Sequence, residues 1–273
     1  MLVVTRPDRP RGRGRRLAPP PVAEAARALD LECFQPTSVN SDDARERIAR
    51  CDPEVVCICA FGALVKDPLL SAYPMLNVHP SLLPRWRGAA PIERAIDAGD
   101  HQTGVSIMRP TAELDAGPVC LQRAEPIHPD DDFASLSTRL ERIAAELVIE
   151  AIDGSPEFVE QASVGVSFAD KVSAADRRLD PTHSAHELER RVRALRPHIG
   201  AYVERDGGER LGVWDARVVS EGVDPSPGVG VLAEQGGRLL LRCGDLALEL
   251  LEVQAPGGRR MDVAAYLRGR RGR

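Results

Sequence analysis

The stretch LNVHPSLLPRWRGAAPI, Leu76 to Ile92, contains the end of a strand, a loop and the start of a helix. The apolar run ends at His79, prolines and arginines follow, and Pro91 suits the first turn of a helix. Asn77 and His79 are two residues apart, so on a strand both side chains project to the same face. An amide that donates to a developing oxyanion, beside an imidazole that moves protons near neutral pH, predicts attack on a carbonyl at this strand end.

Helical patterns and short apolar runs alternate on both sides of this stretch. The apolar runs are MLVVT (1–5), EVVCICAFG (54–62), TGVSIMRP (103–110) and PVCLQR (118–123). Helical spacing covers 22–29, the segment opened by Ser41 or Asp42, APIERAIDAG (90–99) and 132–153. This alternation predicts an α/β domain with a mostly parallel sheet and helices on both faces. Ligands of such sheets bind beyond the carboxyl ends of the strands, where Asn77 and His79 are expected.

A second domain is predicted after a change in composition near residues 165–185. Beyond it, a short helical segment, HELERRVRALRP, precedes short strand-like runs separated by RDGGER, EQGGR and RCGDL, a spacing typical of a small barrel. We expect a catalytic domain at 1–170, a linker at 171–182 and a C-terminal domain at 183–273.

Arginine is concentrated near the two ends of a chain whose net charge is −5. The segment RPDRPRGRGRR, Arg6 to Arg16, has six arginines against one aspartate, and glycine and proline between them predict a loop. Such a run is either a solvated charged segment or a strap that contacts the phosphates of a nucleic acid.

The remaining composition indicates a globular cytoplasmic protein. No apolar run approaches the roughly 20 residues of a membrane helix, and the N-terminus lacks the apolar segment of a signal peptide. The six cysteines include no C-x-x-C pair, so we expect reduced core thiols, with Cys57 and Cys59 on a buried strand. His183 and His186 have no third ligand nearby in the sequence, and no metal site is predicted.

The stretch NVHPSLLPRWRGAAPI, followed by ELDAGP at residues 113–118, resembles the signature of the folate-dependent formyltransferases. That resemblance implies 10-formyltetrahydrofolate as co-substrate, without a metal. The resemblance extends to those members of the family that formylate methionyl-initiator tRNA. Four further segments carry it: TRPDRPRGRGRRLAPPPV, CICAFGALV, RLDPTHSAHELERRVRALRPHIGAYV and LLRCGDLALELLEVQAPGGRRMDVAAYLRG. It implies a monomer with a Rossmann-like α/β formyltransferase domain and a small OB-like β-barrel domain, which suits a tRNA arm.

The resemblance also assigns roles to individual residues. It implies a catalytic trio of Asn77, His79 and Asp115, in which Asp115 orients His79. The residues expected at the folate are Ser81, Leu82, Leu83, Pro84, Phe61 and Gly62. Those expected at the tRNA are Arg9, Arg11, Arg13, Arg15 and Arg16.

The chain departs from the family pattern in two places. Members normally have a further strand, turn and helix before the strand seen here as MLVVT, and without them two strand edges and an apolar groove are expected to stay open. Three explanations stay open: a start codon assigned too far downstream, a degenerate paralogue, or a compensating partner chain. The segment RALRPHIGA replaces an aromatic, proline-rich segment at the domain junction. Two functional alternatives are a non-catalytic tRNA-binding paralogue and a formyltransferase of small-molecule amines.

Overall fold

The computed structural model describes residues 1–11, 16–224 and 226–271. Residues 11, 206 and 271 are described by their backbone alone. The chain divides into two compact units. The first comprises Met1–His79, Ser106–Gln122 and Ala144–Ala162, and the second comprises Pro80–Val105, Arg123–Ile143 and Ser163–Arg273. Three elements contribute residues to both: β8 (Gln102–Met108), β9 (Val119–Pro126) and α5 (Phe133–Gly154).

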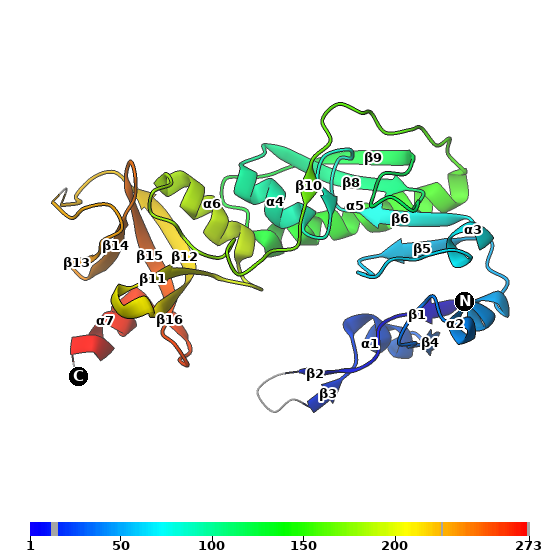
Figure 1. Ribbon diagram of the computed structural model, residues 1–273, viewed down its shortest axis with the longest axis horizontal. Coiled ribbons are helices and arrows are strands. Elements are labelled where there is room, and N and C mark those ends of the chain that lie inside the picture. Colours follow the sequence, from blue (N-terminus) through cyan, green and yellow to red (C-terminus); the bar gives the residue numbers. More distant parts are fainter. Residues whose placement is uncertain (12–15, 225, 272–273) are drawn as a thin grey trace. The chain divides into compact units, whose positions relative to one another are not determined.

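The first unit contains the N-terminal strands and helices of the α/β domain, from β1 to β6 (Figure 1). Its further elements are β1 (Leu2–Val4), β2 (Arg9–Arg11), β3 (Arg16–Ala18), α1 (Pro21–Ala28), β4 (Glu32–Phe34), α2 (Asp42–Ala49), β5 (Val56–Cys59), α3 (Leu69–Ala72) and β6 (Met75–His79). The Ser41 hydroxyl accepts a hydrogen bond from the Ala44 N–H and caps α2 as expected. Strand β1 is parallel to β4, and β5 is parallel to β6. The prediction of a mostly parallel sheet is only partly right, because β8 runs antiparallel to β6.

Strands β1 and β5 both have an open edge among the described residues. Strand β1 pairs with β4 alone, and β5 is the first strand of the order β5-β6-β8-β9. Residues of both strands nevertheless pack on one apolar cluster around Val39, Ile48, Leu69 and Met75. The expectation that Cys57 and Cys59 are buried is wrong: both are exposed, because β5 is an edge strand and they alternate with its half-buried Val56 and Ile58.

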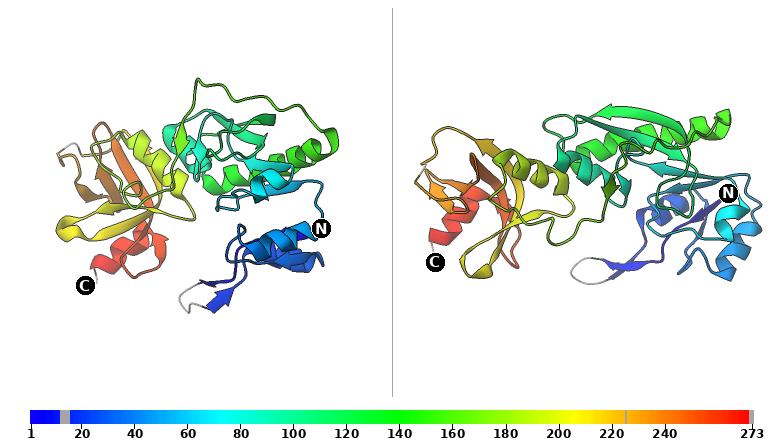
Figure 2. Two further views of the ribbon diagram at one scale, coloured as in Figure 1. Left: turned by 45° about the vertical axis from the view of Figure 1, so that its right-hand side comes forward. Right: turned by 45° about the horizontal axis from the view of Figure 1, so that its top comes forward.

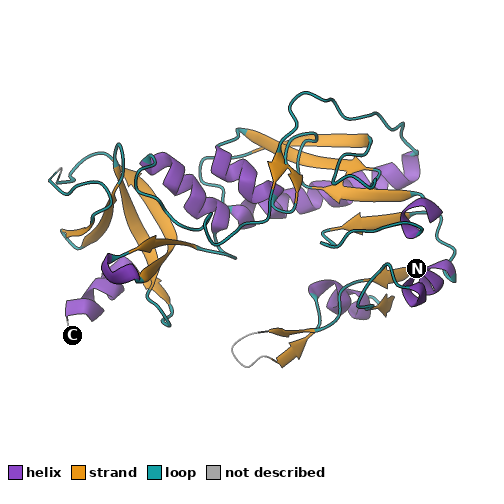
Figure 3. Cartoon of the chain, in the orientation of Figure 1, coloured by secondary structure: helices purple, strands orange, loops and turns teal. Residues whose placement is uncertain are grey.

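The arginine-rich segment is more regular than predicted. Strands β2 and β3 pair antiparallel, with Arg9 opposite Ala18 and Arg11 opposite Arg16, and lie side by side (Figure 3). The prediction of a loop is therefore wrong at these positions. Pro10 is tolerated because a two-stranded hairpin consists of edge strands only.

The second unit combines a helical segment with an antiparallel sheet. Its further elements are β7 (Arg87–Gly88), α4 (Pro91–Ala98), β10 (Phe168–Ala169), α6 (Ala185–Leu195), β11 (Ala201–Glu204), the 3₁₀ turn η1 (Asp206–Gly208), β12 (Arg210–Val219), β13 (Leu232–Gln235), β14 (Arg238–Arg242), β15 (Ala247–Gln254), β16 (Arg260–Asp262) and α7 (Val263–Arg271). The large sheet has the order β11-β12-β15-β14-β13, with β16 on β15. Helices α6 and α7 pack against this sheet (Figure 2). The core of the unit includes Leu188, Val213 and Leu248.

Helix α6 also packs against α4. Its N-terminus has a capping box, in which Ser184 and Glu187 satisfy each other's backbone N–H groups. Arg191 on α6 pairs with Asp97 on α4 at 3.2 Å, and the Arg190 guanidinium donates to the Asp97 backbone carbonyl. The second unit therefore joins α4 to the C-terminal sheet through helix packing and charge.

The order of elements along the chain confirms the predicted fold class, an α/β part followed by a small domain of short strands. No helix in the described ranges combines the length and the apolar character needed to cross a membrane.

Candidate active site

Strand β6 brings Asn77 and His79 to its carboxyl end. His79 is 4% exposed, and its Nδ1 lies 3.6 Å from Oδ2 of Asp115. Asn77 is half-buried and alternates with the buried Leu76 and Val78. The structure thus brings His79 and Asp115 together and places Asn77 two residues before the histidine.

Asp115 is carried on the turn between β8 and β9. Its φ of +46° lies in the left-handed region, which aspartate tolerates better than most residues. A Cβ at Gly117 would collide with the Arg109 carbonyl, so the closing turn requires glycine there. Gln161 donates from Nε2 to the backbone carbonyls of Asp115 and Gly117, at 2.8 and 2.7 Å.

A further polar pair lies next to His79 in the sheet. Ser106 on β8 is the register partner of His79 and is fully buried, and its hydroxyl accepts a hydrogen bond of 2.8 Å from Gln122 Nε2 on β9. A carboxylate against an imidazole, with an amide nearby, can accept a proton, return it and stabilise an oxyanion.

Phe61 and Gly62 follow β5 in the first unit. Phe61 packs on the apolar cluster of that unit, and its carbonyl accepts a hydrogen bond of 2.9 Å from Arg6 Nε. Gly62 has a φ of +64°, and a Cβ there would collide with the Arg6 guanidinium. Arg6 was not predicted at this loop, because nothing in its local pattern indicates a contact 55 residues away.

The segment Ser81–Pro84 follows His79 after a single residue, Pro80, and belongs to the second unit. The Ser81 hydroxyl is fully buried and donates to the Arg85 carbonyl at 2.6 Å, and Leu83 is buried. Leu82 lies against Gly104, where a Cβ would approach Leu82 Cδ2 to 2.6 Å. The Arg123 carbonyl would be closer still, 2.2 Å from such a Cβ, so residue 104 must be glycine where Leu82 packs.

The arginines expected at a nucleic acid are only partly described. The Arg9 and Arg16 side chains are exposed, without an ion-pair partner among the described residues. Arg11 lies in β2 and is described by its backbone alone, and Arg13 and Arg15 lie outside the described residues.

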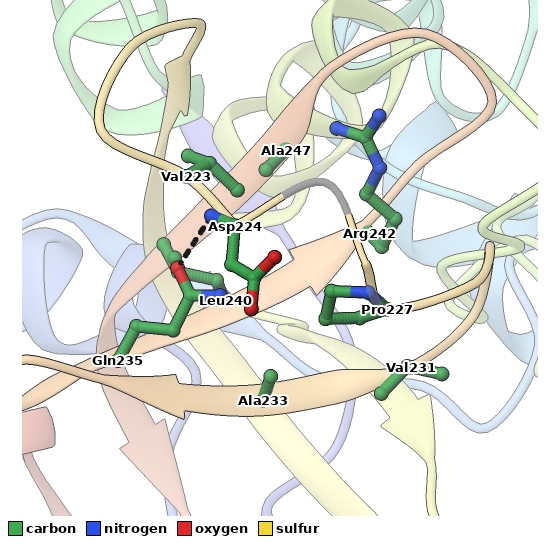
Figure 4. A pocket seen from close by; sticks show the side chains of 9 residues that line it. All are labelled: Val223, Asp224, Pro227, Val231, Ala233, Gln235, Leu240, Arg242 and Ala247. Atoms are coloured by element: carbon green, nitrogen blue, oxygen red, sulfur yellow. Dashed lines mark hydrogen bonds between the residues drawn. The ribbon is translucent and has the colours of Figure 1, made fainter.

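Two cavities lie apart from the pair of His79 and Asp115. One of about 800 Å³ adjoins the start of β6 and is lined by Tyr73, Met75, Arg109 and Phe158. The other, in the C-terminal sheet, is about 10 Å³, room for a single water, and lies beside Asp224 and Gln235 (Figure 4). Within the described ranges, no group of three or more histidine, cysteine or acidic side chains could hold a metal ion.

Comparison with known proteins gives matches along nearly the whole chain. The family model described as formyl transferase matches residues 1–152, and that of the formyl transferase C-terminal domain matches residues 171–271. Methionyl-tRNA formyltransferase of Methylococcus capsulatus is 41% identical over 97% of this chain and 87% of its own length. The enzyme of the same name from Dechloromonas aromatica is 40% identical over 98% of this chain and 87% of its own length.

Solved structures agree in fold. A variant of HypX from Aquifex aeolicus superposes with a TM-score of 0.67 at 21% identity, over 89% of this chain and 45% of that protein. Methionyl-tRNA formyltransferase from Clostridium thermocellum superposes with a TM-score of 0.58 at 15% identity, over 74% of this chain and 88% of that protein.

Proposed function

Because this chain belongs to the formyl transferase family, we propose that it transfers the formyl group of 10-formyltetrahydrofolate to the amino group of methionyl-initiator tRNA, for translation initiation. The observation that carries the proposal is the pairing of His79 with Asp115 at the end of β6, beside Asn77. Relatives named methionyl-tRNA formyltransferase, about two fifths identical over nearly the whole chain, support the acceptor.

In the proposed reaction, the methionyl nitrogen forms a bond to the formyl carbon, and the bond from that carbon to N10 of the folate breaks. The amine attacks as the neutral species and loses a proton after addition, and N10 leaves with a proton. His79, held against the Asp115 carboxylate, takes the first proton and gives a proton to N10. The Asn77 amide donates to the formyl oxygen as it becomes negative, an interaction typically worth about 3 to 4 kcal/mol.

Two loops are proposed to hold the folate. Ser81, Leu82, Leu83 and Pro84 form the loop after β6, and Phe61 with Gly62 forms the loop after β5. Both are short and bring backbone amides and carbonyls together with apolar side chains, a combination that suits a flat heterocycle.

The arginine hairpin and the C-terminal domain are proposed to hold the tRNA. The exposed Arg9 and Arg16, with Arg11, Arg13 and Arg15 between them, would contact backbone phosphates. The small antiparallel domain would add an oligonucleotide-binding surface.

The functional division of the chain is part of the same proposal. Residues 1–170 would carry the catalysis, residues 171–182 the connection and residues 183–273 the tRNA contacts. We propose that the protein works as a monomer in the cytoplasm, where its six cysteines stay reduced.

The test is formation of formyl-methionyl-tRNA by the purified 273-residue chain from 10-formyltetrahydrofolate and methionyl-initiator tRNA. We expect turnover that is lost in His79→Ala while the variant stays folded. A folded wild-type chain that binds tRNA and forms no product would contradict the proposal and identify a tRNA-binding protein. Formylation of small amines without formylation of tRNA would contradict the proposed acceptor.

A further inference from the structure

Residues 159–170, called the strap here, follow α5 and lead into the C-terminal domain. The family models match residues 1–152 and 171–271, so the strap lies in an interval that neither covers. Its residues nevertheless hydrogen-bond to two loops that the proposed reaction uses, the Asp115 turn and the loop that follows β6.

The first half of the strap is bonded to the turn of Asp115 within the first unit. Val159 and Val119 exchange backbone hydrogen bonds of 2.8 and 2.9 Å, which fixes the strap beside the start of β9. Gln161 then donates to the carbonyls of Asp115 and Gly117.

The two hydrogen bonds from Gln161 stabilise the turn at Asp115, whose backbone conformation is unfavourable for a residue other than glycine. Asp115 has a positive φ, a conformation that persists in a non-glycine residue when its surroundings hold it. Because the same residue faces His79 at 3.6 Å, a change in its backbone would move the carboxylate relative to the imidazole.

The second half of the strap is bonded to the loop that follows β6, within the second unit. The Ser167 hydroxyl accepts from the Trp86 N–H at 2.9 Å, and its carbonyl accepts from the Arg87 N–H at 2.9 Å. Ser167 also donates from its backbone N–H to the Pro84 carbonyl at 3.4 Å, so a single strap residue bonds to three loop residues.

The contact continues through β10, which pairs parallel with β7. Gly88 has a φ of +126°, and a Cβ there would lie 2.7 Å from the Ala169 carbonyl, so the close approach requires glycine. A separate anchor of the same loop is Asp100, which pairs with Arg85 and accepts from the Trp86 indole N–H at 2.8 Å.

We propose that the strap is a positioning element for formyl transfer. Gln161 fixes the turn of Asp115, and Ser167 fixes the end of the loop that follows β6, at Pro84, Trp86 and Arg87. The proposal rests on the proposed function. It assigns separate effects to the two residues: Gln161 acts through Asp115 on the chemical step, and Ser167 acts through the loop on binding of the folate.

Gln161→Glu keeps the size of the side chain and removes the N–H donors. We expect kcat to fall about tenfold, with the KM for 10-formyltetrahydrofolate changed less than about twofold. Gln102→Glu, the same substitution at an exposed residue of β8, is the matched control and should leave both constants unchanged. An unchanged kcat in Gln161→Glu would overturn the assignment.

Ser167→Ala removes the acceptor for the Trp86 N–H. We expect the KM for 10-formyltetrahydrofolate to rise about fivefold with little change in kcat. Ser167→Thr keeps the hydroxyl and should restore the KM, and Ser163→Ala, at an exposed strap residue, is the control. Equal effects of the two strap variants on kcat and KM, with a lowered Tm in both, would indicate structural support only and overturn the proposal.

Amide hydrogen exchange on the same variants tests the positioning without turnover. Gln161→Glu should speed exchange at residues 109–117 and spare 85–88, and Ser167→Ala should do the reverse. If the wild-type chain forms no formyl-methionyl-tRNA, the proposed function fails, and the exchange pattern still decides for or against the strap. Faster exchange throughout the chain, or unchanged exchange at both 109–117 and 85–88, would overturn the proposed role of the strap.

Discussion

Asn77 is a half-buried amide on β6, between the buried Leu76 and Val78, so its side chain can be truncated without opening the core. Asn77→Ala removes the donor proposed for the formyl oxygen, and we expect kcat to fall about 100- to 1,000-fold with little change in Tm. Steady-state rates at saturating folate and tRNA, with a melting curve, measure both effects. A kcat within about threefold of wild type would contradict the assigned role.

Asp131, just before α5, is a second residue with a measurable role, in this case in stability. Burial alone would raise the pKa of its carboxyl, but hydrogen bonds from Arg139, Ser135 and the His128 N–H outweigh burial and hold that pKa well below its usual range. The stabilisation is therefore present above the unfolded-state pKa of about 3.9 and is lost as the pH falls through the folded-state value.

We expect Asp131→Asn to lower the free energy of unfolding at pH 7 by about 2 to 3 kcal/mol. As the pH falls below about 4, the wild type should lose stability faster than the variant, and urea unfolding at a series of pH values down to about pH 2 would measure this difference. Asp130→Asn, at the exposed neighbour, is the control. Parallel stability curves for wild type and Asp131→Asn would contradict the assignment.

At the scale of elements, the hairpin β2–β3 presents exposed arginines on two short strands. Replacement of Arg9 and Arg16 by alanine should raise the KM for tRNA. A plot of log KM for tRNA against log salt concentration should also become less steep, by about one unit of slope for each phosphate that the hairpin no longer neutralises. Folate binding should not change. Arg142→Ala, at an exposed arginine of α5, is the matched control. A tRNA KM with wild-type salt dependence would exclude the hairpin from tRNA binding.

Local signals predicted the elements better than the contacts between them. Ser41 placed the start of α2, and the apolar spacing of residues 132–153 placed α5 within a few residues. Asn77 with His79 marked the candidate site. The exposure of Cys57 and Cys59 depends on which strand lies at the sheet edge, which no single run of residues encodes. The contacts of Gln161 were likewise not predictable, because a side chain bonded to distant backbone carbonyls leaves no periodic pattern.

At the scale of the whole molecule, the compact units do not follow the two family models. Residues 80–105 and 123–143 belong to the first matched segment, yet they form one unit with the C-terminal domain. The RALRPHIGA segment contributes to this: Arg196 pairs with Asp132 at 2.9 Å, and the His198 ring lies 3.9 Å from that of Phe133 and bonds to Glu93. The junction segment thus joins helix α5 and helix α4 through charged and ring contacts.

This organisation predicts that unfolding is cooperative across the boundary between the two matched segments. Leu188 of α6 is fully buried, and Leu188→Ala should destabilise the second unit by about 3 kcal/mol. Because α6 packs on α4, amide exchange should quicken in α4 as well as in β12 and β15, and stay unchanged in α2. Leu69→Ala, in the core of the first unit, should speed exchange in α2 and leave α4, β12 and β15 unchanged. Faster exchange confined to residues 171–271 in Leu188→Ala would show instead that the C-terminal domain opens alone and that α4 is stabilised by the first matched segment.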